Sequence, residues 1–183
     1  SPMRYAHLAA ITAAREAGAI LSFDPNLRFP LWPDREQLRQ TVWQFLPLTH
    51  ILKLSDEELP FLTGTEDIET ALPQLFTGDV QLVLYTCGSK GARAYTRTTA
   101  ASARSPKVTA VDTTGAGDGF IGSFLWQLQR DGVTAVELAK LSRKRLTEYL
   151  TFSNRFCALS VQHHGAIDSY PSLEQMEAEF SPL

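Results

Sequence analysis

The stretch from Val111 to Phe124 carries the residues best suited to chemistry. It reads VDTTGAGDGFIGSF, with Gly115, Ala116 and Gly117 in succession. Small residues leave the backbone N–H groups unshielded, and an amphipathic helix is expected to begin directly after them. A helix N-terminus presents unpaired N–H groups and the positive end of the helix dipole. The loop is therefore suited to binding a phosphate or a developing negative charge.

Asp118 lies in the first turn of the expected helix. The helix dipole stabilises its carboxylate as the anion, which is the form that accepts a proton. An anion-binding loop beside a proton acceptor indicates phosphoryl transfer, because that reaction needs positioning, charge neutralisation and removal of the proton of the attacking hydroxyl. A small-residue turn followed by Asp is also an ordinary helix start, and this alternative stays open on the residues alone. The segment is neither a Walker A loop nor a Rossmann fingerprint, because no Gly-Lys-Ser/Thr follows and the glycine spacing differs.

The segment DTTGAGDGFIGSF resembles, over its full length, the second signature of the ribokinase-like (PfkB) carbohydrate kinases, and the chain is most similar to a bacterial fructokinase. The resemblance implies that the backbone amides of Gly115, Ala116 and Gly117 form an anion hole. It also implies that Asp118 deprotonates a sugar hydroxyl. The expected reaction is ATP-dependent phosphorylation of a primary hydroxyl of a small sugar, first of all fructose to fructose 6-phosphate.

Two further segments resemble the family's substrate and magnesium elements. FDPNLRFPLW, residues 23–32, is similar to the DxNxR element, in which Asn26 and Arg28 would lie near the phosphates or the phosphorylated end of the substrate. A guanidinium binds phosphate oxygens in pairs, although a surface arginine in a turn is the alternative. KLSDEELPFLTG, residues 53–64, resembles the stretch with an Asn-x-x-Glu motif, where Glu58 would organise Mg²⁺ through bound waters and Ser55 replaces the Asn. The same spacing predicts a helix capping box between Ser55 and Glu58.

The nucleotide and a monovalent cation are expected at two other segments, TCGSKGA (residues 86–92) and FSNRFCALSVQHHGAIDSYPS (residues 152–172). The first is similar to the family's T-x-G-x-x-G loop, with a plain hairpin turn as the alternative. The nucleotide-binding residues that the resemblance implies are Thr86, Gly88, Ser89, Gly91 and Asn154, the last at the position that contacts adenine in relatives. Relatives also bind a monovalent cation, often K⁺, and the matching positions are Asp112, Thr114, Ser160, Gly165 and Ser169. Adjacent His163 and His164 do not share a helix face, and we interpret them as solvated or core-edge residues rather than metal ligands.

Apolar periodicity and turn residues predict alternating strands and helices. Strands are expected at residues 19–23, 51–54, 81–86 and 92–96, and helices near 8–14, 33–45, 66–76, 116–129, 133–145 and 147–162, with a short one after Ser55 that Gly64 ends. This alternation predicts an α/β fold, a doubly wound and mostly parallel sheet flanked by helices. Residues 1–183 are expected to form the nucleotide-binding, catalytic part of one ribokinase-like domain.

Composition and net charge indicate which partners and which cellular location to expect. The net charge of −3 gives no electrostatic footprint for nucleic acid, and no apolar run approaches the ~20 residues that span a bilayer, so no membrane partner is expected. Cys87 and Cys157 lie far apart, which favours reduced thiols and a cytoplasmic location.

The resemblance does not include the family's N-terminal half, which carries the sugar-binding segment and the lid. We therefore expect the chain to bind ATP with Mg²⁺, with K⁺ assisting, but not to turn over fructose alone. It is expected to need the missing half or a second copy of itself as partner, because a sheet edge would otherwise be exposed. A 2-keto-3-deoxygluconate kinase and a non-catalytic nucleotide-binding module are the alternatives. A Rossmann dehydrogenase is disfavoured, because no Gly-x-Gly-x-x-Gly follows the first strand.

Overall fold

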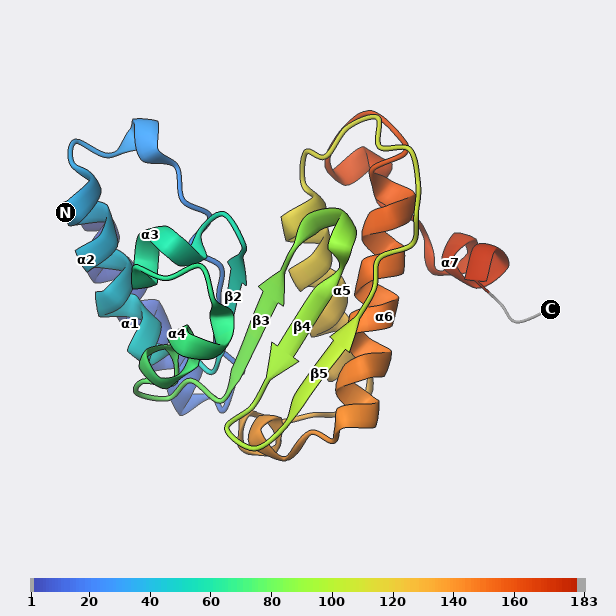
Figure 1. Cartoon of the computed structure of the whole chain (residues 1–183). Coiled ribbons are helices and arrows are strands. Elements are labelled where there is room, and N and C mark those ends of the chain that lie inside the picture. Colours follow the sequence, from blue (N-terminus) through green and yellow to red (C-terminus); the bar gives the residue numbers. More distant parts are fainter. Residues whose placement is uncertain (1, 181–183) are drawn as a thin grey trace. The chain divides into compact units, whose positions relative to one another are not determined.

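The computed structural model describes residues 2–180, and it contains a five-stranded sheet in the order β1-β2-β3-β4-β5 (Figure 1). The described residues group into two compact units. Unit 1 comprises residues up to 86, 94–99 and 133–141, and unit 2 comprises residues 87–93, 100–132 and those from 142 onward. The principal elements are α1 (Pro2–Glu16), β1 (Ser22–Phe23), α2 (Arg35–Phe45), β2 (Ile51–Ser55), α3 (Leu59–Thr63), α4 (Ile68–Leu75), β3 (Leu82–Thr86), β4 (Ala92–Tyr95), β5 (Ala100–Ala103), α5 (Ala116–Arg130), α6 (Arg143–Ser160) and α7 (Leu173–Phe180).

The core of unit 1 is formed by parallel strands. β2 pairs with β1 on one side, with Ser22 opposite Ile51, and with β3 on the other, with Ile51 opposite Leu82. The first four residues of both β2 and β3 are buried. Strands buried on both faces require nearly continuous apolar runs, which explains why these segments do not alternate between apolar and polar residues. Lys53 interrupts the apolar run of β2.

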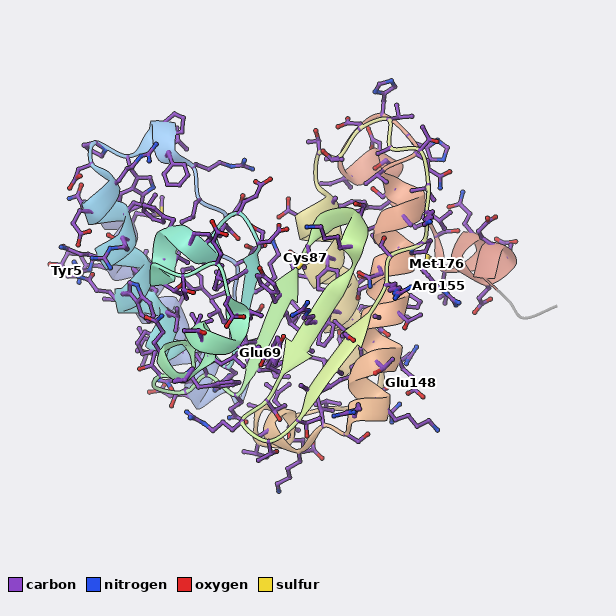
Figure 2. The ribbon with its side chains drawn as sticks, viewed as in Figure 1. Tyr5, Glu69, Cys87, Glu148, Arg155 and Met176 are labelled. Atoms are coloured by element: carbon purple, nitrogen blue, oxygen red, sulfur yellow. The ribbon has the colours of Figure 1, made fainter. Side chains whose placement is uncertain are left out.

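Helix ends in unit 1 follow from local sequence signals. Asp34 is the N-cap of α2, where its carboxylate accepts hydrogen bonds from the backbone N–H groups of Glu36 and Gln37. Gly64 ends α3 with a φ of 76°, a left-handed conformation that favours glycine. No residue of α1 that the structure describes is buried, and Tyr5 points outward with 75% of its surface exposed (Figure 2).

The core of unit 2 lies along the contact between α5 and α6, and α6 also packs against β5 (Figure 1). Phe120, Phe124 and Leu128 share one face of α5 and are buried, as their four-residue spacing predicts. Gln127 is also buried, and its side-chain amide donates to the backbone oxygen of Tyr149 on α6 at 3.1 Å. This bond satisfies a polar group that would otherwise be costly to bury.

The structure confirms the four expected strands to within a few residues, and it contains further elements that were not expected. β5 was not expected, and neither was the helix α7, whose Met176 is buried (Figure 2). The prediction of one helix over residues 133–145 is wrong. Residues Ala135–Lys140 form a 3-10 helix, η4, because Leu141 leaves it with an extended ψ of 127° and Ser142 caps a new helix, α6. None of the helices within residues 2–180 is long and apolar enough to cross a membrane.

Candidate active site

The glycine loop and the start of α5 form the centre of the site in unit 2. Gly115 is the N-cap of α5, with a φ of 77°. The N–H of Ala116 donates to the carbonyl oxygen of Thr113 at 3.2 Å, which closes a turn ahead of the helix. The N–H groups of Gly115 and Gly117 donate to no group among the described residues 2–180. Two of the three amides expected to form the anion hole are therefore available to a ligand, and the third holds the turn.

Asp118 is exposed in the first turn of α5, as the sequence predicts. It borders a cavity of about 390 Å³ whose wall is mostly apolar and aromatic, including Trp126, Phe156 and Tyr170. Such a wall offers few donors for phosphate oxygens or sugar hydroxyls. We therefore do not expect phosphate or sugar to bind in this cavity, and the role of proton acceptor that is expected of Asp118 stays a prediction.

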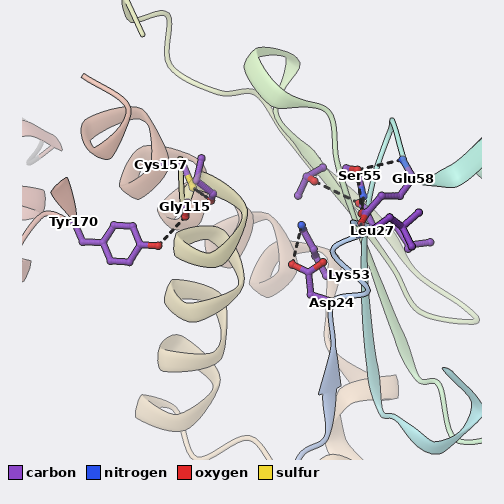
Figure 3. Close-up of polar contacts among 11 residues, drawn as sticks. Asp24, Leu27, Lys53, Ser55, Glu58, Gly115, Cys157 and Tyr170 are labelled. Carbon is purple, nitrogen blue, oxygen red and sulfur yellow. Dashed lines mark hydrogen bonds and ion pairs between the residues drawn. The ribbon is translucent and has the colours of Figure 1, made fainter. Parts of the chain in front are cut away.

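Tyr170 and Cys157 were not expected at the site, and both contact the glycine loop (Figure 3). The hydroxyl of Tyr170 donates to the carbonyl oxygen of Gly115 at 2.7 Å, and the thiol of Cys157 donates to the carbonyl oxygen of Ala116 at 3.2 Å. Burial raises the pKa of Tyr170, and the negative charge of Asp118 raises it further, so the hydroxyl remains a donor. The sequence carries no signal for these contacts, because they join segments 55 and 41 residues apart.

The residues expected to bind a monovalent cation are brought together in unit 2. One carboxylate oxygen of Asp112 accepts the backbone N–H of Thr114 at 2.9 Å, and the other accepts that of Gly165 at 3.1 Å. Hydrogen bonds from Thr114 and then Gly165 lower the pKa of Asp112 to about 2, so the carboxylate is anionic. The hydroxyls of Ser160 and Ser169 lie 2.7 Å apart. Hydrogen bonds from residues 111, 112 and 165 join the loop before α5 to the segment that follows α6, and the binding of K⁺ there stays a prediction.

The expected nucleotide loop spans residues 86–92, and its residues 87–91 make a tight turn in unit 2. The N–H of Cys87 donates to the carbonyl oxygen of Gly91 at 2.8 Å, and Gly88 and Gly91 have φ values of 51° and 100°. A Cβ at Gly91 would lie 2.2 Å from the carbonyl oxygen of Ala103, so only glycine fits there. A Cβ at Gly88 would meet nothing within 4 Å, and Ser89 is exposed, so this side of the turn is open.

Asn154 lies in α6 and is buried, with 5% of its surface exposed. Its side-chain amide donates to the carbonyl oxygen of Ala103 at 2.9 Å, so it ties α6 to the end of β5. This contact is a structural role that the sequence did not predict. The adenine contact expected of Asn154 stays a prediction.

Unit 1 holds the other expected site residues. Asn26 has a φ of 44°, and both Asn26 and Arg28 are exposed. The side chain of Arg28 makes no hydrogen bond or ion pair with the described part of the chain, so its guanidinium is available to an anion. Thr86, at the end of β3, points its hydroxyl to the carbonyl oxygen of Leu54 at 3.4 Å.

Glu58 fixes the backbone around Asn26 and Arg28 (Figure 3). One carboxylate oxygen accepts the N–H of Leu27 at 3.0 Å, and the other accepts both the N–H and the hydroxyl of Ser55, at 2.9 and 3.0 Å. The N–H of Glu58 donates back to the Ser55 hydroxyl at 3.2 Å, which is the expected reciprocal pair. The pair lies in the turn before α3 rather than at its first residue, because Glu58 itself is the N-cap. The indirect contact with Mg²⁺ that is expected of Glu58 stays a prediction.

Asp24 and Lys53 form a buried ion pair that the sequence analysis missed (Figure 3). The Nζ of Lys53 lies 2.9 Å from the Oδ2 of Asp24, and their side chains are 7% and 15% exposed. Burial raises the pKa of Asp24, and the attraction of Lys53 only partly opposes this. A lysine inside an apolar strand, with an aspartate directly after the neighbouring strand, was the signal that could have found the pair.

The pfkB carbohydrate kinase family matches residues 1–173. The chain belongs to this family. It is similar to probable fructokinase-4 of Arabidopsis thaliana, with 41% identity over 179 residues, which is 97% of this chain and 53% of the relative. The chain thus spans about half the length of the curated relatives that it matches.

Solved structures of the family share the fold. A fructokinase with bound ATP from Xylella fastidiosa matches 95% of this chain and 56% of its own, with a TM-score of 0.86 and 32% identity. The fructokinase of Vibrio cholerae O395, solved with fructose, ADP and calcium, matches 97% of this chain and 56% of its own, with a TM-score of 0.83 and 33% identity. A double mutant of the same enzyme was solved with fructose, ADP and potassium. The expected ribokinase-like α/β fold and the sugar kinase family are confirmed.

Proposed function

We propose that the chain is the nucleotide-binding, catalytic part of an ATP-dependent kinase that converts fructose to fructose 6-phosphate. The observation that carries the proposal is the glycine loop of unit 2, where the amides of Gly115 and Gly117 donate to no group within residues 2–180 and Asp118 lies in the first turn of α5. Phosphoryl transfer needs this pair of functions, a charge-stabilising hole and a proton acceptor. The similarity to fructokinases supports fructose as the acceptor.

In the proposed reaction, Asp118 accepts the proton of the fructose 6-hydroxyl while the hydroxyl oxygen forms a bond to the γ-phosphorus of ATP. The bond from that phosphorus to the β,γ-bridging oxygen breaks, and ADP leaves. The loop amides receive the negative charge that gathers on the transferred group. Asn26 and Arg28 would hold phosphate or substrate oxygens, and the 87–91 loop with Thr86 and Asn154 would hold the nucleotide. Mg²⁺, when bound to the nucleotide, neutralises phosphate charge, and we assign Glu58 to its water shell. K⁺ would be held by Asp112, Thr114, Ser160, Gly165 and Ser169.

The relatives' greater length leads us to propose a partner, either the remainder of a longer protein or a second copy of this chain. We also propose a cytoplasmic location. The 183 residues alone are expected to bind ATP without turning over fructose, because in-line attack requires the sugar to be held and water to be excluded.

A coupled ADP-release assay on the longest form of the protein tests the proposal. Fructose, 2-keto-3-deoxygluconate and ribose are compared as acceptors with ATP, Mg²⁺ and K⁺. Turnover with fructose is expected to exceed turnover with the other two sugars. A preference for 2-keto-3-deoxygluconate would support the alternative kinase, and nucleotide binding without turnover of any sugar would support a non-catalytic module.

Asp118→Asn tests the role of the base, because it keeps the side-chain shape and removes the proton acceptor. We expect kcat to fall by about two to four orders of magnitude, with little change in nucleotide affinity. Asp34→Asn is the matched control, because asparagine caps a helix as well as aspartate does. Near-wild-type turnover by Asp118→Asn would exclude Asp118 as the base.

A further inference from the structure

Two side chains from outside the glycine loop hydrogen-bond to its backbone carbonyls. Tyr170, in the loop before α7, donates to Gly115, and Cys157, in α6, donates to Ala116 (Figure 3). All four residues lie in unit 2. We refer to Tyr170 and Cys157 as the carbonyl clamp.

A carbonyl and the N–H that follows it belong to one rigid, planar peptide group and point in opposite directions. A hydrogen bond that fixes the carbonyl of Ala116 therefore also fixes the N–H of Gly117, which is one of the two loop amides that donate to no group in the described part of the chain. The preceding peptide group is held on both sides: its carbonyl, that of Gly115, accepts the Tyr170 hydroxyl and also the N–H of Gly119 at 2.8 Å, and its N–H donates to Thr113. The two peptide groups are thus oriented before any ligand arrives.

The side chain of Tyr170 is itself held in place by close packing. Its ring lies 5.3 Å from the ring of Phe156, measured between centroids. A Cβ at Gly119 would lie 3.1 Å from both rings, and a Cβ at Gly115 would lie 3.0 Å from the Tyr170 hydroxyl oxygen. Both glycines therefore let the tyrosine approach the helix start closely enough to reach the Gly115 carbonyl.

Resting on the proposed function, we propose that Tyr170 and Cys157 are positioning residues, which preorganise the anion hole by aiming the N–H of Gly117 at the transferred phosphoryl group. Donors that are aimed before the reaction stabilise the transition state without a cost of reorganisation. The clamp should therefore matter for the transferred group and not for the ADP part of the nucleotide.

The backbone order parameter of the Gly117 N–H, measured by ¹⁵N relaxation on the 183-residue chain, tests the geometry without any ligand. A rigid amide gives about 0.85 and a flexible one below about 0.6. We expect a value near the first in the wild type and a clear fall in both Tyr170→Phe and Cys157→Ala. Cys157→Ser keeps a donor and should restore the wild-type value. Tyr95→Phe is the control, because it removes a hydroxyl that donates to Glu69 at 2.9 Å in unit 1.

Calorimetry of the same chains with Mg²⁺–ADP, alone and with aluminium fluoride as the mimic of the transferred group, tests the role. The wild type should bind ADP more tightly when fluoride is present. In Tyr170→Phe and Cys157→Ala, the increase in ADP affinity caused by aluminium fluoride should be about three- to tenfold smaller, which is the effect of one hydrogen bond. Their affinity for ADP alone should stay unchanged.

The outcomes separate the two proposals. A wild-type chain that binds no ADP overturns the proposed function, while the order parameter still reports on the clamp. The carbonyl clamp alone is overturned if the wild type binds ADP but the variants match it in two respects. These are the order parameter of the Gly117 N–H and the increase in ADP affinity that aluminium fluoride causes. Weaker ADP binding in the variants without fluoride would show a merely structural effect and would also overturn it.

Discussion

Replacing Gly115 by alanine tests both the backbone strain and the close packing at the glycine loop. The left-handed conformation at φ 77° costs a residue with a Cβ about 1–2 kcal/mol. The new Cβ would also lie 3.0 Å from both the Cβ of Ala166 and the hydroxyl oxygen of Tyr170. Overpacking of this kind costs about 1–3 kcal/mol more. The expected loss of stability is the sum, about 2–5 kcal/mol.

Gly64→Ala isolates the strain, because Gly64 has a φ of 76° and nothing lies within 4 Å of its Cβ position. Alanine also reduces the entropy of the unfolded chain at both positions, and this gain cancels in the comparison. Gly115→Ala should therefore be more destabilising than Gly64→Ala by about 1–3 kcal/mol.

Native-state hydrogen exchange measures each unit separately, which avoids assuming that the two units unfold together. The most protected amides of unit 2 report on Gly115→Ala, and those of unit 1 report on Gly64→Ala. Equal costs would refute the reasoning, because they would mean that Ala166 and Tyr170 do not lie against Gly115. The hydroxyl contact of the carbonyl clamp would then fail as well.

Three further predictions concern unit 2. Gly122→Ala should raise stability by about 0.5–1 kcal/mol in thermal denaturation, because Gly122 lies inside α5 with nothing within 4 Å of its Cβ position; a loss would mean that the helix is packed more tightly there. Asn154→Ala should cost about 1–3 kcal/mol in urea denaturation, because it leaves the carbonyl of Ala103 without its donor; no loss would place that carbonyl in contact with water. The pKa of Asp112 is lowered from 3.8 to about 2, so its carboxylate stabilises the fold above pH 3.8 and loses this effect as the pH falls toward 2. The difference in stability between wild type and Asp112→Asn should shrink over that interval in an acid titration, and a constant difference would contradict the hydrogen bonds from Thr114 and Gly165.

Local signals in the sequence predicted the parts of the fold that depend on a few neighbouring residues. The apolar runs of β2 and β3, the end of α3 at Gly64 and the buried face of α5 were all predicted from spacing and residue type. The reciprocal bonds of Ser55 and Glu58 were predicted as well. In each case the interacting groups lie within a few positions of one another, so the local sequence is sufficient to predict them.

The helix expected at 133–145 shows where local signals fail. Its apolar residues have helical spacing, but burial of Leu138 and Leu141 is achieved with a 3-10 helix and an extended residue instead. The break places Ser142 where it can cap α6, and its hydroxyl accepts the N–H of Arg145 at 3.3 Å. Periodicity does not distinguish between an α-helix over residues 133–145 and a 3-10 helix followed by an extended residue, because both bury the same side chains.

The sequence by itself determined the chemistry available to this protein: a loop of small residues at a helix start, with an aspartate in the first turn. Only the tertiary structure decided how that loop is held. Tyr170 reaches Gly115 across 55 residues, and Asn154 reaches Ala103 across 51. Lys53 finds Asp24 only because β1 and β2 pair in parallel. Such contacts depend on which segments pack together, and for Tyr170 and Asn154 the spacing of residues along the chain gives no signal of that packing.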